Sequence, residues 1–306
     1  MKKGILHLMI FSIPVFLGLV VIEMALRNVP NTYKLKNDYL IENSNEIEVL
    51  ILGNSQTFYG LDPQFISAKA FNAAHISQLF SQDKQLWEKY FPNMPKLKYL
   101  VISFSIQSFY DQGGDLPFIH KNYVLYYGFS NQIGWKYGLE LTALPMRANL
   151  IRLIKNIQDG EIDYPSSPLG FGLGYKTGGS INLETNAKEA IARHLLLNGK
   201  IIEEELKALE AIVRSASQKE IQTILLATPV SKQYYSFVPQ TVIQEVENIA
   251  SMLSENNQLV TYMNWNQHPD FRDKDFYDAD HLNDAGARKL SLLLDKELDK
   301  KIKPDT

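Results

Sequence analysis

Short apolar runs alternate with longer stretches of mixed polarity along residues 46–306. The apolar runs are candidate strands, and they lie at residues 47–52, 70–74, 99–104, 223–228 and 259–263. Several are apolar almost throughout, which is typical of parallel strands covered on both faces. The clearest helices are predicted at residues 201–216, 241–256 and 284–298, the first from its 3.6-residue apolar period. The alternation predicts a doubly wound α/β sheet of about five parallel strands.

The most apolar part of the chain lies near its start, at residues 4–26, where Glu23 is the one formal charge. About 20 apolar residues cross a bilayer core, so the run predicts an uncleaved transmembrane anchor over residues 1–30. Lys2 and Lys3 favour a cytoplasmic N-terminus. The globular part would then be extracytoplasmic, in the periplasm or at the cell surface. A cleaved signal peptide and a buried core helix are the alternatives.

The rest of the chain divides by its polarity. Residues 31–45 are polar and predict a stalk, and residues 46–306 predict the α/β domain. Residues 111–186 interrupt the alternation and predict an insertion, which is rich in aromatic residues and includes a glycine-rich run at 170–179. That run lacks the spacing of a phosphate-binding loop. The insertion is expected to be mobile or to face the substrate, unless its aromatic residues form a core of their own.

The amino-acid composition argues against several classes of function and binding site. The chain has 306 residues and a net charge of −3, which argues against binding nucleic acid through a basic face. It has no cysteine, so disulfides, thiolate metal sites and cysteine nucleophiles are excluded. Its histidines do not show metal-ligand spacings such as HxxxH, and we expect neither a metal nor a cofactor.

Two short segments carry residues suited to nucleophilic catalysis. Ser55 follows the first predicted strand, which places it at the carboxyl edge of the sheet, where open α/β folds bind ligands. A serine hydroxyl needs a base to become a nucleophile at neutral pH, and His281 can serve as that base. A carboxylate must then orient the imidazole. Asp278 and Asp280 are both close enough in sequence for that role.

These segments resemble the sequence blocks of the SGNH (GDSL-type) hydrolase superfamily. Gly53-Asn54-Ser55 is similar to its GDS block, with Asn in place of Asp, and residues 278–281 are similar to its DxxH block. Residues 72–77 resemble the second block, with Ser77 where the family has glycine. Residues 105–108 resemble the third block, with Gln107 where the family has asparagine.

The resemblance implies a flavodoxin-like three-layer α/β/α sandwich and a catalytic triad of Ser55, His281 and Asp278. It also implies an oxyanion hole made by the Ser55 and Ser77 amides and the Gln107 side chain. Membrane-tethered members of the superfamily are similar in layout to proteins that acylate exported polysaccharides or cell-wall polymers. We therefore expect an esterase or O-acyltransferase that acts on acyl, especially acetyl, groups of a cell-surface or exported polysaccharide.

The expected activity implies two kinds of partner. One is an acylated glycan or another acyl ester as substrate, and the other is a membrane protein that donates acyl groups. The departures in the two inner blocks favour an alternative, in which the chain is a catalytically inactive scaffold or glycan-binding protein of a cell-envelope assembly system.

Overall fold

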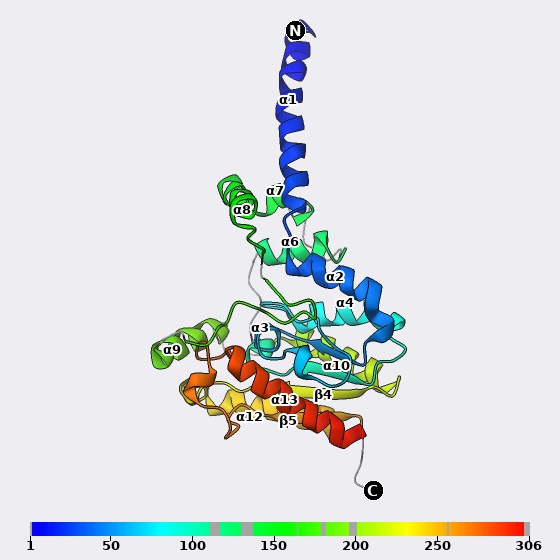
Figure 1. Cartoon of the computed structure of the whole chain (residues 1–306), viewed down its shortest axis with the longest axis vertical. Coiled ribbons are helices and arrows are strands. Elements are labelled where there is room, and N and C mark those ends of the chain that lie inside the picture. The colour runs from blue at the N-terminus through cyan, green and yellow to red at the C-terminus, as the bar shows by residue number, and fades with distance from the viewer. Residues whose placement is uncertain are drawn as a thin grey trace. The chain divides into compact units, whose positions relative to one another are not determined.

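The computed structural model describes residues 2–110, 117–129, 137–163, 165–178, 182–195, 201–255 and 257–302, and the side chains of these residues except 2–10, 117–118 and 301–302. The chain forms two compact units. Unit 1 consists of Met1–Asp38 and Asp115–Pro165, and unit 2 consists of Tyr39–Gly114 and Ser166–Thr306. Figure 1 labels several elements of each unit, among them α1 and α8 of unit 1 and α13 and β5 of unit 2.

A five-stranded sheet lies at the centre of unit 2, and all its neighbouring strands pair in parallel. The strands are β1 (Val49–Leu52), β2 (Ala70–Asn72), β3 (Tyr99–Ser103), β4 (Gln222–Ala227) and β5 (Val260–Asn264). Their order is β2-β1-β3-β4-β5, which is the flavodoxin-like order. All five predicted strands are therefore present, and the predicted α/β class with a parallel sheet is confirmed.

Helices connect and cover these strands. The α-helices of unit 2 are α3 (Ser55–Phe58), α4 (Phe80–Tyr90), α5 (Gln107–Tyr110), α9 (Leu183–His194), α10 (Glu203–Ser217), α11 (Lys232–Phe237), α12 (Gln240–Ser254) and α13 (Asp284–Ile302). Short 3₁₀ turns lie at Ser44–Glu46, Pro63–Phe65, Phe91–Asn93 and Asp273–Asp275. The three helices predicted from the sequence correspond to α10, α12 and α13.

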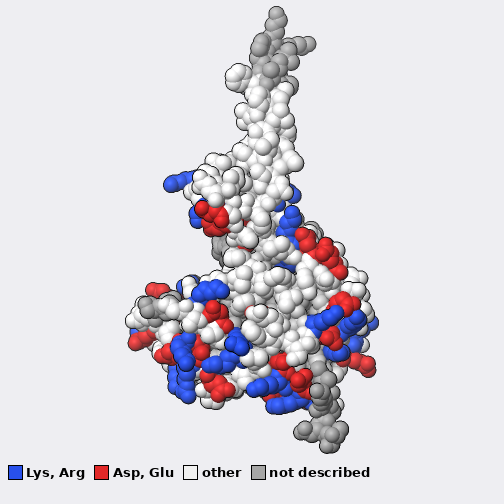
Figure 2. All heavy atoms as spheres, viewed as in Figure 1, with Lys and Arg blue, Asp and Glu red and all other residues white. Residues whose placement is uncertain are grey.

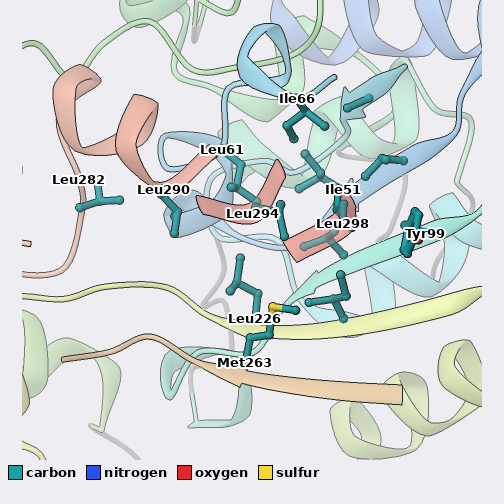
Figure 3. Packing of buried hydrophobic residues seen from close by; sticks show 14 of the residues in the cluster. Ile51, Leu61, Ile66, Tyr99, Leu226, Met263, Leu282, Leu290, Leu294 and Leu298 are labelled. Atoms are coloured by element: carbon teal, nitrogen blue, oxygen red, sulfur yellow. The ribbon is translucent and has the colours of Figure 1, made fainter. Parts of the chain in front are cut away.

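One face of the sheet packs against α13 (Figure 3). Leu290, Leu294 and Leu298 recur every four residues, so they lie along one side of this helix. They join strand residues such as Ile51 and Leu226 in a single buried cluster. Full burial of each such side chain is worth about 1.5–3 kcal/mol relative to exposure. This packing fixes the start of α13, and with it the loop that precedes the helix.

The opposite face of the sheet is buried as well. Side chains alternate along a strand, so Leu50 and Leu100 point away from the α13 cluster, and both are at most 2% exposed. Helix α10 contacts both β4 and α4, and α12 contacts β5. Burial on both faces explains why the strands read as continuous apolar runs.

Charged side chains of both signs cover the visible face of unit 2. Figure 2 shows Lys and Arg interspersed with Asp and Glu over this face. Several of them pair, for example Glu46 with Lys69 at 2.6 Å and with Lys96 at 2.8 Å. Exposed pairs of this kind contribute little to stability, typically about 0–1 kcal/mol each.

Unit 1 has its own helices and its own aromatic core. Its helices are α1 (Lys2–Arg27), α6 (Pro117–Leu125), α7 (Glu140–Ala143), α8 (Met146–Asp159) and the first residues of α2 (Thr32–Asn43). Tyr33 packs edge-to-face against Tyr123 and Tyr127, and all three are at most 2% exposed. Tyr123 and Tyr127, which belong to the predicted insertion, are therefore core residues of unit 1, whereas Trp135, another aromatic residue of the insertion, lies outside the described residues.

The predicted membrane anchor requires correction. Among the residues that the structure describes, no helix is long and apolar enough to cross a membrane. The absence of such a helix among these residues contradicts the predicted membrane-anchored, extracytoplasmic localisation. Towards the end of α1, Glu23 pairs with Arg27 at 2.6 Å and accepts hydrogen bonds from two backbone N–H groups of α7.

Candidate active site

Three of the predicted site residues meet at the carboxyl edge of the sheet. Ser55 Oγ lies 2.8 Å from Nε2 of His281, although the two residues are 226 positions apart in the chain. Nδ1 of the same ring lies 2.9 Å and 3.1 Å from the two carboxylate oxygens of Asp278. Because a carboxylate accepts the Nδ1 proton, Nε2 of the neutral ring is left as a hydrogen-bond acceptor facing the serine hydroxyl.

Gly53 makes the turn that presents Ser55. Its φ of 123° is disfavoured for residues that carry a Cβ, and a Cβ added there would lie 2.2 Å from the Cβ of Ser103 on β3. Its N–H donates to Asp83 Oδ1 at 2.9 Å. Burial raises the pKa of Asp83 to about 7. Only glycine fits this turn without displacing β3.

Asn54 ties the serine turn to the segment after β3. Its side-chain oxygen accepts the Gln56 N–H at 3.0 Å and so caps α3. Its amide nitrogen donates to the hydroxyls of Ser105 at 2.8 Å and Ser108 at 2.9 Å. An amide can donate and accept at once, whereas a carboxylate only accepts. Asparagine therefore satisfies both sets of partners without placing a charge in a buried position.

Local hydrogen bonds organise the loop that carries the histidine. Asp278 Oδ1 accepts the backbone N–H groups of Asp280 at 3.1 Å and of His281 at 2.9 Å. The N–H of Tyr277 donates to the carbonyl of His281 at 3.0 Å. This closed turn brings the Asp278 carboxylate to Nδ1 of His281. Asp280 is the less direct of the two candidate partners, because its nearer oxygen is 3.6 Å from Nδ1.

The two carboxylates dominate the electrostatics of the ring. Burial lowers the pKa of His281, but Asp280 and Asp278 outweigh burial and raise that pKa to about 9. Burial opposes ionisation of Asp278 as well, yet the His281 ring and the backbone N–H groups lower the pKa of its carboxyl below the usual value. The arrangement strongly favours an imidazolium, which is the state that forms when the ring accepts the serine proton.

The predicted oxyanion-hole residues Ser77 and Gln107 lie on two segments that hydrogen-bond to the serine turn. The amides of Gln56, Thr57 and Phe58 already donate to Asn54, which leaves the Ser55 amide as the donor of this turn for a substrate. Gln107 begins α5, and its Nε2 is buried without a hydrogen-bond partner among the described residues.

Ser77 lies on the loop after β2, in a left-handed conformation. Its φ is 52°, a region that glycine adopts without strain and serine adopts at a cost. The same loop is attached to the serine turn, since the His75 N–H donates to the Gly53 carbonyl at 3.1 Å. Ser77 therefore keeps the backbone shape expected of the glycine that the sequence resemblance places there, and its role as a donor stays a prediction.

A stack of three tyrosines forms a wall beside His281, and the sequence did not reveal it. Tyr175 stacks between Tyr59, at 3.7 Å between ring centroids, and Tyr277, at 4.0 Å. It meets the His281 ring edge-to-face at 5.3 Å. Tyr175 belongs to the glycine-rich run, and a Cβ at Gly172 would lie 2.5 Å from the Tyr59 ring. The glycines therefore let this run pass close to Tyr59, and the aromatic residue among them was the available signal.

A metal is the other ligand that these side chains could hold. Donor atoms of Asp278, Asp280 and His281 all lie within 4.8 Å of one another. However, Nδ1 of His281 is engaged by Asp278 and Nε2 by Ser55. A metal would have to displace one of these two contacts, so the arrangement fits proton transfer better than metal binding.

A separate cavity lies elsewhere in unit 2. It has a volume of about 650 Å³, and its lining includes His268, Arg272 and Lys274. Neither Ser55 nor His281 lines it. We therefore do not assign it to the site around the serine.

Comparison with known proteins leaves the family open. No family model matches the chain, and no curated protein matches it. A solved structure provisionally described as a platelet activating factor from Streptococcus pneumonia is similar to it, with 12% identity and a TM-score of 0.42. That similarity covers 94% of this chain and 98% of the other. At this level of similarity the match does not assign a function.

Proposed function

We propose that the protein is a serine-dependent acyl-ester hydrolase or acyltransferase of SGNH type. The observation that carries the proposal is the continuous chain of contacts from Ser55 Oγ through His281 to Asp278, with separations of 2.8 Å and 2.9 Å. Ser55 Oγ attacks the acyl carbonyl while His281 Nε2 takes its proton. The imidazolium then returns that proton to the leaving oxygen, and Asp278 keeps the ring oriented in both steps.

An oxyanion forms on the acyl carbonyl during the attack and needs donors. The Ser55 amide and the Gln107 amide group are our candidates, with Ser77 as a third. A buried donor without a partner costs about 1–3 kcal/mol in the free protein. That cost is offset if the substrate supplies the acceptor, which supports Gln107 as a donor. One such donor is typically worth about 10²–10³ in rate.

The second half of the reaction decides between hydrolysis and transfer. Water attacks the acyl-Ser55 ester in a hydrolase, whereas a sugar hydroxyl attacks it in a transferase. The narrower assignment, to acetyl groups of a polysaccharide, rests on the sequence resemblance. The stacked tyrosines add no support for sugar binding, because both faces of Tyr175 are covered by Tyr59 and Tyr277.

The decisive experiment compares Ser55→Ala with Ser236→Ala, an exposed serine on α11. We expect Ser55→Ala to lower kcat/KM for p-nitrophenyl acetate by about 10⁴-fold or more. It should also abolish labelling by a fluorophosphonate probe. Ser236→Ala should change neither readout, and the unfolding midpoint of both variants should stay close to that of the parent.

Equal activity in the Ser55→Ala variant would refute the assignment. A parent protein that neither turns over the ester nor accepts the probe would instead favour the inactive scaffold. Adding an alcohol acceptor, and measuring transferred ester against free acid, separates a transferase from a hydrolase.

A further inference from the structure

A second buried carboxylate lies beside the catalytic histidine, and the triad does not use it. Asp280 is 1% exposed, and neither of its carboxylate oxygens has a hydrogen-bond partner among the described residues. One oxygen lies 3.6 Å from Nδ1 of His281, and the other lies 3.9 Å from Nε2 of His194. A buried carboxylate without donors is costly unless a nearby positive charge compensates it. The nearest group that can become positive during catalysis is the His281 ring.

The backbone around Asp280 is fixed by two helices, so its carboxylate has little freedom to move towards water. The N–H of Ala279 donates to Asn186 Oδ1 on α9 at 2.8 Å. The carbonyl of Ala279 accepts the Ser231 N–H, at the start of α11, at 2.9 Å. Hydrogen bonds to α9 and to the start of α11 thus fix both the N–H and the carbonyl of Ala279, the residue that precedes Asp280.

His194 does not neutralise this carboxylate at neutral pH. Burial lowers the pKa of His194 to about 4, so its ring is uncharged near pH 7. Its Nδ1 lies 2.9 Å from the hydroxyl of Tyr234, which is itself buried. The His194–Tyr234 pair therefore forms an uncharged wall behind Asp280, and the electrostatic effect of Asp280 falls on His281.

We propose that Asp280 is a positioning residue for His281, a second carboxylate that acts through charge and sets the pH at which Ser55 becomes reactive. This proposal rests on the proposed function. Asp278 bonds to the ring and fixes its tautomer, whereas Asp280 stabilises the imidazolium from a distance without a hydrogen bond. The other titratable or charged groups around His281 and Asp280 are Arg193, His194, Tyr234, Tyr59, Tyr175 and Tyr277.

The test is the substitution Asp280→Asn, which removes the charge and keeps the shape. A charge at this distance typically shifts a pKa by about 1–3 units, so the pKa of His281 should fall by about that amount. The neutral fraction of the ring at pH 7 then rises. The ratio of kcat/KM at pH 7 to kcat/KM on the alkaline plateau should therefore be about tenfold higher, or more, in the variant than in the parent. A merely structural role would lower the plateau and leave the pH midpoint unchanged.

Two measurements keep the outcome separate from the fate of the proposed function. NMR titration of histidine Cε1–H signals, with His281 assigned through a His281→Gln variant, reports its pKa whether or not the protein is an enzyme. The pH profile of p-nitrophenyl acetate hydrolysis reports the same group through activity. Asp270→Asn, which removes an exposed carboxylate, is the matched control and should move neither midpoint.

If Asp280→Asn does not fold, the smaller neutral variant Asp280→Ser is expected to give the same shift. An unchanged His281 pKa in a folded variant would overturn the role of Asp280, even if Ser55 proves to be the nucleophile. A shifted His281 pKa without any esterase or acyl-transfer activity would support the electrostatic coupling and refute the proposed function alone.

Discussion

Each unit of the molecule contains a buried carboxylate, and the two differ in their hydrogen bonds. Glu140 in unit 1 is completely buried, and it accepts hydrogen bonds from Lys121, Arg152 and Tyr126 at 2.6–2.9 Å. Asp280 in unit 2 is just as inaccessible, yet both of its oxygens lack a hydrogen-bond partner among the described residues.

The difference separates a structural charge from a functional one. A buried ion pair whose members are all hydrogen-bonded holds its neighbours in one arrangement. A buried carboxylate without donors is retained at a cost, and it acts on whatever charge develops nearby. In the proposed mechanism that charge develops on His281, whose Nδ1 lies 3.6 Å from the nearer carboxylate oxygen of Asp280.

Removing the charge of Glu140, the hydrogen-bonded carboxylate of unit 1, should give the largest effect on stability. The substitution Glu140→Gln leaves the ammonium of Lys121, which is 2% exposed, without its counter-charge. We expect a loss of about 3–5 kcal/mol in the free energy of unfolding. Denaturant unfolding, followed by the signals of unit 1, measures it.

The control for this substitution is Glu46→Gln. Its side chain is 41% exposed and pairs with two lysines, so it should lose less than about 1 kcal/mol. Equal losses of unfolding free energy in the two variants would mean that burial does not make the ion pairs of Glu140 more important for stability than exposed pairs.

The buried carboxylates beside His281 should affect the pH dependence of activity, because they raise the pKa of the ring. His281 accepts the serine proton only when its ring is neutral, so kcat/KM should rise with pH. With the pKa of His281 raised to about 9, the value at pH 7 should be roughly 100-fold below the alkaline plateau. Initial rates with p-nitrophenyl acetate from pH 6 to about 10 provide the measurement. A profile that is flat or falling between pH 7 and 9 would contradict the raised pKa.

The same pKa predicts a change in stability with the opposite sign. A raised histidine pKa contributes stability that is fully present below about pH 6.5 and is lost as the pH rises through about 9. The Ser55→Ala variant should keep this dependence while losing the activity, which separates titration of the ring from catalysis.

A smaller effect is expected at two left-handed positions, one in each unit. Gly160 at the end of α8 in unit 1 has a φ of 65°, whereas Ser77 in unit 2 has a similar φ of 52° with a side chain present. Ser77→Gly should raise the unfolding free energy by about 0.5–1 kcal/mol, because it relieves backbone strain.

Gly160→Ala is the reverse substitution and should cost about 1 kcal/mol. A Cβ at this position meets no atom within 4 Å, so the cost comes from the backbone alone. Unfolding midpoints at constant m-value measure both variants. A stabilising Gly160→Ala, or a destabilising Ser77→Gly, would show that φ does not govern these positions.

The local features of unit 2 could be predicted from the sequence. Each strand was placed to within about two residues, because an uninterrupted apolar run is short, bounded and compatible with few alternatives. The D-x-x-H segment could be identified because Asp278 bonds to the backbone and ring of a residue three positions later. Asp278 and Asp280 could not be separated by spacing, since the choice depends on how that turn closes.

Long-range features were predicted less well. The apolar N-terminal run suggested a membrane anchor, and the structure contradicts it. The aromatic residues of the insertion were open to two interpretations, facing the substrate or forming a core of their own, and Tyr123 and Tyr127 lie in the core of unit 1. Tyr175 and His194 were not identified as site residues, because each reaches the site through packing with residues far away in the sequence.

The amino-acid sequence by itself determined the strands, the serine turn and the aspartate–histidine turn, since each depends on backbone preferences and burial within about ten neighbouring residues. The tertiary structure alone decided which groups surround His281. The parallel strand order and the packing of α9, α11 and α13 bring together residues that are separated by up to 226 positions. No local preference encodes those distances, because they arise only when the apolar faces of separate elements are buried together.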